Sequence, residues 1–178
     1  MPCVSSGVYP GSFNPPTIAH LAIANAAREH YGLSLVELAI STVALDKESV
    51  VVPTFEDRVD VVRQSCADLD WLDVVVTSEQ LLADIAEGYD VLIMGEDKWA
   101  QLHERRYYDS DEHMAECLRR LPALAIAPRP GQAPVEAVAI PAEARLAVDE
   151  WVLDVSSSAA RSGRTDWMTP AAASSGHW

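Results

Sequence analysis

The chain has 178 residues, of which 22% are charged and 49% are hydrophobic, as in an ordinary soluble protein rather than a disordered or fibrous one. This length suits a single domain, 1–178, because domains typically have about 100–150 residues. The net charge of −14 repels nucleic-acid phosphates, so we expect no nucleic-acid partner, and we expect any anionic ligand to be held by a few local basic groups.

The first half of the chain alternates between short apolar runs and helical patterns. In chain order the sequence predicts a strand at 4–9, a helix at 17–31, a strand at 35–42, a loop at 44–53, a helix from Thr54 and a strand at 72–77. The first helix is rich in Ala and Leu and stops at Gly32. Thr54 is a candidate N-cap because apolar residues follow it at spacings of four and three.

The same alternation continues in the second half. It predicts a helix at 79–87, a strand at 89–94, a helix at 98–103, a helix at 112–121, strands at 123–127 and 151–155, and a helix that opens at Ser156-Ser157-Ser158. A Pro-rich loop begins at Arg129. The tail from about residue 171 (AAASSG) consists of small residues, and we expect it to be frayed.

Strands that alternate with helices and read as continuous apolar runs indicate an α/β fold, a doubly wound and mainly parallel sheet covered on both faces. Ligands in such folds bind at the carboxyl ends of the strands. Motif-bearing loops follow Tyr9, Thr42, Met94 and Val155. We expect these four loops to converge on one crevice.

The three cysteines, Cys3, Cys66 and Cys117, have no C-x-x-C spacing. This argues against a disulfide framework and against a thiolate zinc site. The sequence also contains neither a signal-peptide pattern nor an apolar run of about 18 residues, so we expect a cytoplasmic protein with no membrane span.

The loop after the first strand, GSFNPPTIAH (11–20), opens a helix with unusual residues. Thr17 and His20 are three apart in the first turn and share a face. The free amides and the dipole of a helix start favour an anion, and a hydroxyl and an imidazole add donors there. Gly11 would allow close backbone approach. Taken alone, such a pair is better explained as a helix cap and a packed histidine.

A second candidate phosphate site lies near the other end of the chain. SSSAAR (156–161) follows an expected strand, so its serines would cap a helix and expose hydroxyls and amides. Arg161, one turn in, adds a fork suited to phosphate. Such a helix start is ordinary by itself, but two of them at one edge of a parallel sheet are not.

These segments resemble those of a known superfamily. The 11–20 loop resembles the (H/T)-x-G-H loop of the nucleotidyltransferases, and VSSSAAR (155–161) resembles their I-S-S-T-x-x-R helix. GEDKWAQL (95–102) with APRPG (127–131) is similar to the G-x-D and R-P-G segments of nicotinate and nicotinamide mononucleotide adenylyltransferases. The resemblance covers nearly the whole chain.

Two departures from the superfamily pattern are small. Ala19 stands where Gly is usual, and Ser158 stands where Thr is usual. The donors Thr17, His20 and Arg161 remain in place. The resemblance implies a Rossmann-like nucleotidyltransferase fold in which ATP, with Mg²⁺, lies across the crevice and a phosphate of the acceptor attacks its α-phosphorus, releasing pyrophosphate.

The resemblance also assigns roles to particular residues. The expected catalytic residues are His20, Thr17 and Lys47; the expected nucleotide-binding residues are Gly11, Ser12, Phe13, Ser156, Ser157, Ser158 and Arg161; the expected acceptor-binding residues are Gly95, Asp97, Trp99 and Arg129; no side-chain metal ligand is expected. Three of these residues have an alternative: Lys47 could be a solvated loop lysine, Asp97 a helix cap, and Trp99 a core residue.

The acceptor suggested by the resemblance is a pyridine mononucleotide, with nicotinate mononucleotide favoured over the amide, in NAD biosynthesis. The alternative is phosphopantetheine adenylyltransferase, because Tyr9-Pro-Gly-Ser-Phe and Thr17 are also typical of that family, although its R-G-L-R stretch is missing here. A cytidylyltransferase lacks support, since R-T-x-G-I-S-T-T is absent. A nucleotide-binding regulator without turnover is the non-enzyme alternative, and a homo-oligomer is left open.

Overall fold

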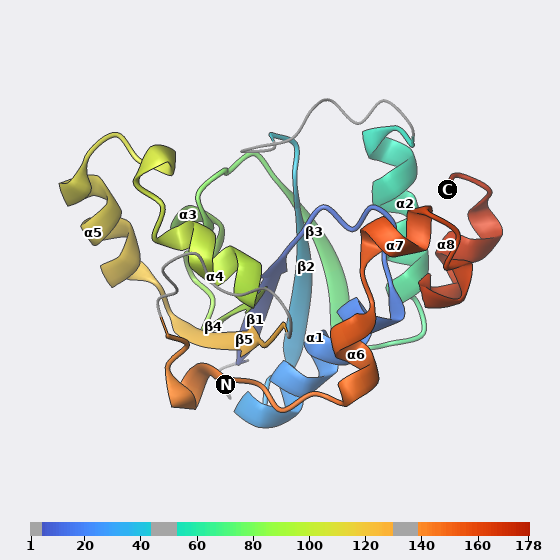
Figure 1. The fold of residues 1–178 in the computed structure, drawn as a ribbon, viewed down its shortest axis with the longest axis horizontal. Helices are drawn as coiled ribbons and strands as arrows, with labels where there is room; N and C mark the ends of the chain where they lie inside the picture. The colour runs from blue at the N-terminus through green and yellow to red at the C-terminus, as the bar shows by residue number, and fades with distance from the viewer. Residues whose placement is uncertain (1–4, 44–52, 130–138) are drawn as a thin grey trace.

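The computed structural model describes residues 5–43, 53–129 and 139–178 (Figure 1). The elements are β1 (Ser6–Pro10), α1 (Ile18–Tyr31), β2 (Leu35–Ser41), α2 (Phe55–Cys66), β3 (Leu72–Thr77), α3 (Leu82–Ile85), β4 (Val91–Gly95), α4 (Glu96–Leu102), η1 (Arg105–Tyr107), α5 (Asp111–Arg120), β5 (Ala123–Ala127), η2 (Ala142–Ala144), α6 (Glu150–Asp154), α7 (Ser157–Arg161), η3 (Thr165–Trp167) and α8 (Pro170–Ser175).

The five strands form one parallel sheet in the order β3-β2-β1-β4-β5. Gly7 in β1 is in register with Val36 of β2 on one side and with Val91 of β4 on the other. The chain therefore winds outward from β1 in both directions, and the strand order reverses between β1 and β4, the position at which such folds are expected to bind ligands. The prediction of a doubly wound parallel sheet is confirmed.

Two apolar layers cover the two faces of the sheet. On one face, α1 and α2 bury residues such as Ala24 and Val62 against Leu38 and Ile93. On the other face, α4 and the segment around α3 pack residues such as Leu102 on the strands, and Figure 1 shows α3, α4 and α5 on the side away from α2. The inner strands β1, β2 and β4 are therefore covered on both faces, which explains their continuous apolar sequences.

Local signals explain where several helices begin and end. The Thr54 hydroxyl accepts a hydrogen bond from the Asp57 amide at 3.1 Å, so Thr54 is the predicted N-cap of α2. Gly32 ends α1 with φ +64°, a conformation that side chains with a Cβ disfavour. Within the described ranges, no helix combines the length and the apolar character needed to cross a lipid bilayer.

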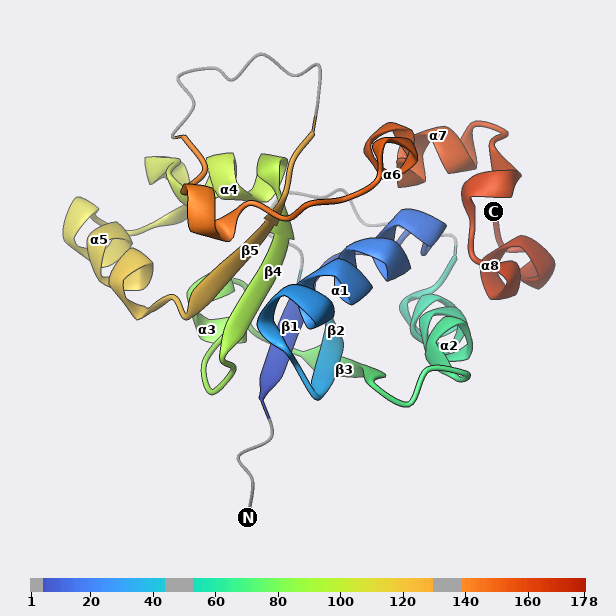
Figure 2. The same cartoon turned by 90° about the horizontal axis from the view of Figure 1, so that it is seen from below.

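Two predicted elements are wrong. Residues 151–155 are not a strand, because Glu150–Asp154 forms the helix α6, which contacts α1. The edge of β5, where a sixth strand would have paired, is met by a bridge from Arg145 to Ile126 and by the bond from the Leu146 amide to the Ile126 carbonyl at 2.9 Å. The tail is not frayed, since Pro170–Ser175 forms α8, which lies beside α2 (Figure 2).

Candidate active site

The loop between β1 and α1 is held in an unusual shape by its own aromatic residue. The Gly11 amide donates to the Ala39 carbonyl at 3.0 Å, which ties the loop to β2. Phe13 has φ +43° and a ring that is 1% exposed. A Cβ on Gly11 would lie 2.7 Å from that ring. Glycine is therefore required here by Phe13, in addition to any approach of a ligand.

Thr17 and His20 form a capping box at the start of α1. The backbone N–H of Thr17 donates to Nδ1 of His20 at 2.9 Å, and the Thr17 hydroxyl lies at the same distance from that nitrogen. A ring nitrogen that carries a proton cannot accept a hydrogen bond, so Nδ1, which accepts from the Thr17 N–H, is the unprotonated nitrogen. A neutral His20 therefore carries its proton on Nε2, and Thr17 fixes the tautomer.

The surroundings of His20 favour the neutral ring. Phe13 packs edge-on against it, with ring centroids 5.0 Å apart, and Tyr9 lies on a further side at 6.1 Å. Burial among these rings lowers the pKa of His20 to about 4. At neutral pH the imidazole is thus a hydrogen-bond donor through Nε2 and carries no charge.

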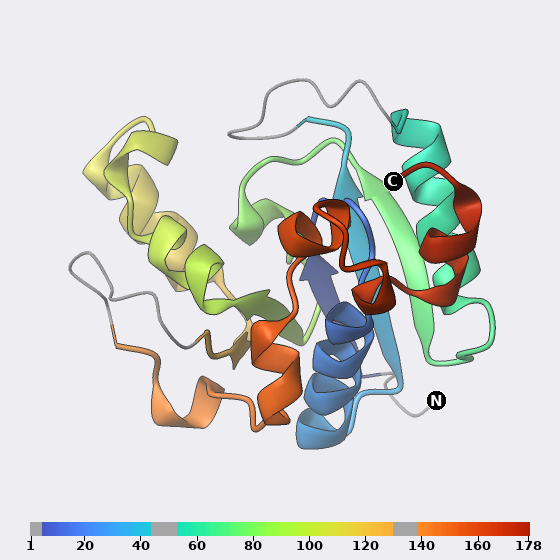
Figure 3. The same cartoon turned by 45° about the vertical axis from the view of Figure 1, so that its right-hand side comes forward.

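The short helix α7 is tied directly to the Gly11–Thr17 loop. The Ser157 hydroxyl donates to the Pro15 carbonyl at 2.8 Å, and the Arg161 guanidinium donates to the Asn14 carbonyl. Ser156 is the N-cap, since its hydroxyl accepts from the Ala159 amide at 3.2 Å. Figure 3 shows α7 over the loop that enters α1. The two candidate phosphate segments therefore lie together, although a helix rather than a strand precedes the second one.

A cavity of about 260 Å³ opens beside this loop, at the carboxyl ends of β1 and β2. Its lining comprises Pro10, Gly11, Ser12, Ala39, Ser41, Val43, Gln80, Leu81, Leu82, Ile85, Lys98, Gln101, Leu102, Tyr107 and Tyr108. Apolar side chains dominate this set, and among the described residues that line the cavity Lys98 carries the one charge. Such a mixture suits a ligand with an apolar body and one anionic group.

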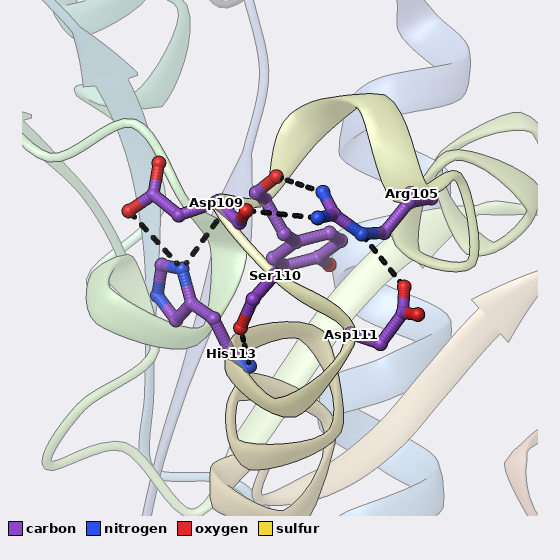
Figure 4. A network of polar contacts seen from close by, with 6 residues as sticks. Arg105, Asp109, Ser110, Asp111 and His113 are labelled. Atoms are coloured by element: carbon purple, nitrogen blue, oxygen red, sulfur yellow. Dashed lines mark hydrogen bonds and ion pairs between the residues drawn. The ribbon is translucent and has the colours of Figure 1, made fainter.

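The outer wall of the cavity, at Tyr107 and Tyr108, is held by one arginine (Figure 4). The guanidinium of Arg105 donates to the carbonyl oxygens of Tyr108 and, at 2.8 Å, of Asp109. Its Nε lies 2.6 Å from the Asp111 carboxylate. Three bonds from one planar group fix the turn between η1 and α5. The aromatic wall is thereby pre-organised.

A family profile described as cytidylyltransferase-like matches residues 8–163, which include both phosphate segments and the cavity. The chain belongs to the cytidylyltransferase-like family. This confirms the resemblance to the nucleotidyltransferase superfamily.

Three curated relatives of this cytidylyltransferase-like chain are each named phosphopantetheine adenylyltransferase. The protein of Rhizorhabdus wittichii is 34% identical over 89 residues, which are 50% of each chain. That of Paracoccus denitrificans is 35% identical over 95 residues, 50% of this chain and 55% of the relative. That of Actinobacillus pleuropneumoniae is 39% identical over 82 residues, 46% and 48% of the two chains. The chain spans about half the length of the curated relatives it matches.

The predicted acceptor-binding residues of this family member do not all lie at one surface. Trp99 is 8% exposed and packs in the core, so it does not offer a ring face to a ligand. Asp97 forms an ion pair with Arg129 at 2.5 Å, and the Arg129 amide donates to Glu96. Gly95 has open space around its Cα. Of the predicted acceptor residues, only this pair at the ends of β4 and β5 brings polar side chains together.

The predicted nucleotide-binding residues Phe13, Ser158 and Ser12 lie in different surroundings. The ring of Phe13 is buried and packs against His20. Ser158 is exposed and accepts from Arg161 at 3.3 Å, and Ser12 lines the cavity. Lys47 lies outside the described residues.

Sequence reasoning missed Lys98, Tyr107 and Tyr108 as cavity residues. Lys98 could have been found, because it lies in the first turn of the helix that follows β4, in a chain with only 13 Lys and Arg residues. The two tyrosines could not, since the polar stretch from Glu104 to Asp111 gives no sign of folding back onto the carboxyl ends of β1 and β2.

Proposed function

We propose that the protein transfers an adenylyl group from ATP to the phosphate of a small acceptor and releases pyrophosphate. The observation that carries this proposal is the junction of the two phosphate segments. Thr17 and His20 start one helix, Ser157 and Arg161 belong to another, and the bonds to Asn14 and Pro15 join them beside a ligand-sized cavity.

The proposed chemistry needs no general base. An acceptor phosphate is already ionised at neutral pH, so one of its oxygens attacks the α-phosphorus directly. The new P–O bond forms as the bond from the α-phosphorus to the α,β-bridging oxygen breaks, and pyrophosphate carries away the electron pair. The Nε2–H of neutral His20 would donate to a non-bridging α-phosphate oxygen as charge develops there. Arg161, one N–H of which binds the loop, has further donors for the leaving phosphates.

Mg²⁺ fits this arrangement without a cage of protein ligands. In the parts of the chain that the structure describes, no group of three His, Cys, Asp or Glu side chains could hold a metal ion. Mg²⁺ commonly binds through substrate phosphates and keeps several waters. When bound with ATP, it would neutralise the charge of the leaving pyrophosphate.

The acceptor we propose is 4′-phosphopantetheine, which has a phosphate at one end and a long, weakly polar body. Two observations support it. The cavity lining is mainly apolar, with Lys98 able to meet a phosphate, and the three relatives are named for this acceptor. A pyridine mononucleotide has weaker support, because Trp99 is buried in the core and the carboxylate of Asp97 is engaged by Arg129.

The test is pyrophosphate release from ATP and Mg²⁺ with 4′-phosphopantetheine, nicotinate mononucleotide or nicotinamide mononucleotide as acceptor. We expect the highest kcat/KM with 4′-phosphopantetheine. In excess chelator we expect no pyrophosphate release with any acceptor. The His20→Ala variant is the blank for contaminating enzymes. A preference for either pyridine nucleotide would refute the acceptor. Binding of ATP without pyrophosphate release from any acceptor would favour the regulator instead.

A further inference from the structure

The last part of the chain packs back onto the site. Residues 164–178 follow the family-matched range 8–163. Met168 and Ala172 are buried in a cluster with Val61 of α2 and Ala160 of α7, and Trp178 packs against it. The hydroxyl of Thr169 lies 2.7 Å from that of Ser65 in α2. Figures 2 and 3 show α8 beside α2, next to α7. We call residues 165–178 the C-terminal strap.

The strap contacts the Gly11–Thr17 loop at three successive places. Met168 forms an antiparallel bridge with Thr17. The Thr169 amide donates to the Pro16 carbonyl at 3.1 Å. The indole Nε1–H of Trp178 donates to the Asn14 side-chain oxygen at 2.5 Å. These contacts use both backbone and side-chain groups, and they tie the strap to the second half of the loop.

Asn14 is the point where the strap meets the phosphate-binding machinery. The residue is 9% exposed. Its side-chain oxygen accepts from Trp178, while its backbone carbonyl accepts from the Arg161 guanidinium. The contact from Trp178 therefore restrains the same residue whose backbone carbonyl holds Arg161. The indole acts on the arginine through one shared residue.

We propose that Trp178 is a positioning residue for the triphosphate, acting through Asn14 to hold Arg161. This rests on the proposed function in one respect, that ATP is the nucleotide bound between the two phosphate segments. Trp178 itself touches neither reactant in this proposal. Its effect should therefore fall on ATP and spare the acceptor.

The test replaces Trp178 by Phe, which removes the N–H donor and keeps a ring for packing. Trp167→Phe is the matched control, because Trp167 is in the same strap, packs against the same cluster and has the guanidinium of Arg164 over its ring. We expect Trp178→Phe to raise the KM and Kd for ATP about three- to tenfold, as loss of one hydrogen bond does. The KM for the acceptor should stay unchanged, and Trp167→Phe should alter neither constant.

A double-mutant cycle separates positioning from a general effect on folding. In an Arg161→Ala background, we expect Trp178→Phe to change the Kd for ATP by less than about 1.5-fold, since the arginine through which the indole acts is gone. Melting temperatures of all variants are measured alongside. An undiminished effect of Trp178→Phe in the Arg161→Ala background would overturn the proposal.

Direct titration with α,β-methylene-ATP separates failure of this proposal from failure of the proposed function. If the wild type binds the analogue and Trp178→Phe binds it equally well, the role of Trp178 is refuted while ATP binding stands. If the wild type does not bind it, both are refuted. An equal rise of KM for ATP and acceptor would make Trp178 a structural residue only.

Discussion

Because His20 is neutral in the folded protein, we expect the free energy of unfolding to fall at acidic pH. We consider the wild type beside His20→Gln, because Gln at the third helical position can still complete a capping box with Thr17 and does not titrate. All other titrating groups are common to the two proteins. The difference between their stabilities therefore isolates the imidazole.

The sign and size of the effect follow from two pKa values. In the unfolded chain the imidazole has its usual pKa of 6.5, whereas in the folded protein burial lowers this pKa to about 4. Between these two pH values the imidazole binds a proton in the unfolded state but not in the native state. The free energy of unfolding therefore falls as the pH falls from 6.5 to 4, and it levels off below pH 4. The pKa difference alone is worth about 3 kcal/mol. Because the ring is only partly enclosed, solvent screening should reduce this to about 1–2 kcal/mol.

Urea unfolding at pH 7.5, 6.0, 5.0 and 4.5 measures the effect. We expect the wild type to lose about 1–2 kcal/mol more than His20→Gln between the first and the last pH. Free energies of unfolding that change in parallel for the two proteins would show that His20 has an ordinary pKa. Burial would then not account for the neutral state of the imidazole, while the tautomer would still rest on the bond from the Thr17 N–H.

Three further predictions concern the same region. His20→Ala should lower the rate of nucleotidyl transfer by ~100-fold, measured as kcat, because one donor to the transition state is lost; a near-normal kcat would make the residue a helix cap only. Gly11→Ala should lower the free energy of unfolding by about 1–3 kcal/mol, because the added Cβ would meet the Phe13 ring. Gly95→Ala is the control: the space around its added Cβ is open, so the free energy of unfolding should change by no more than about 0.5 kcal/mol. Similar urea midpoints for the two variants would contradict this. Trp99→Ala should cost about 3–5 kcal/mol of stability, and Trp99→Phe should leave the acceptor KM unchanged; a raised KM would return Trp99 to the acceptor site.

The sequence predicts the five strands of the sheet because buried parallel strands are short runs of apolar residues bounded by turn or helix signals. Runs such as 35–42 and 89–94 have few alternatives, and Gly32 and Thr54 mark helix boundaries through local chemistry. Residues 151–155 were mistaken for a strand because five apolar-rich residues fit either element. What decides between them is the edge of β5, which is already met by residues 145–146.

The candidate site was predictable where one segment supplies its own chemistry. The relation of Thr17 to His20 follows from helical spacing alone, and the structure adds only the direction of the bonds. Long-range packing decided the rest. Trp99 faces the core rather than the cavity, and Tyr108 reaches the cavity through a turn fixed by Arg105. The sequence predicts a frayed tail because its small residues give no local signal that the segment forms a helix and packs against α2.

The closeness of Trp178 to Asn14 has a practical consequence for handling the protein. A purification tag or a fluorescent fusion attached after Trp178 would be anchored beside the Gly11–Thr17 loop, at the same edge of the sheet as the cavity. One attached ahead of β1 would leave from the opposite edge, where that strand begins (Figure 1). Kinetic constants measured on a fusion joined directly after Trp178 would therefore include the influence of the fused group on the Gly11–Thr17 loop, whereas a fusion joined ahead of β1 would leave that loop untouched.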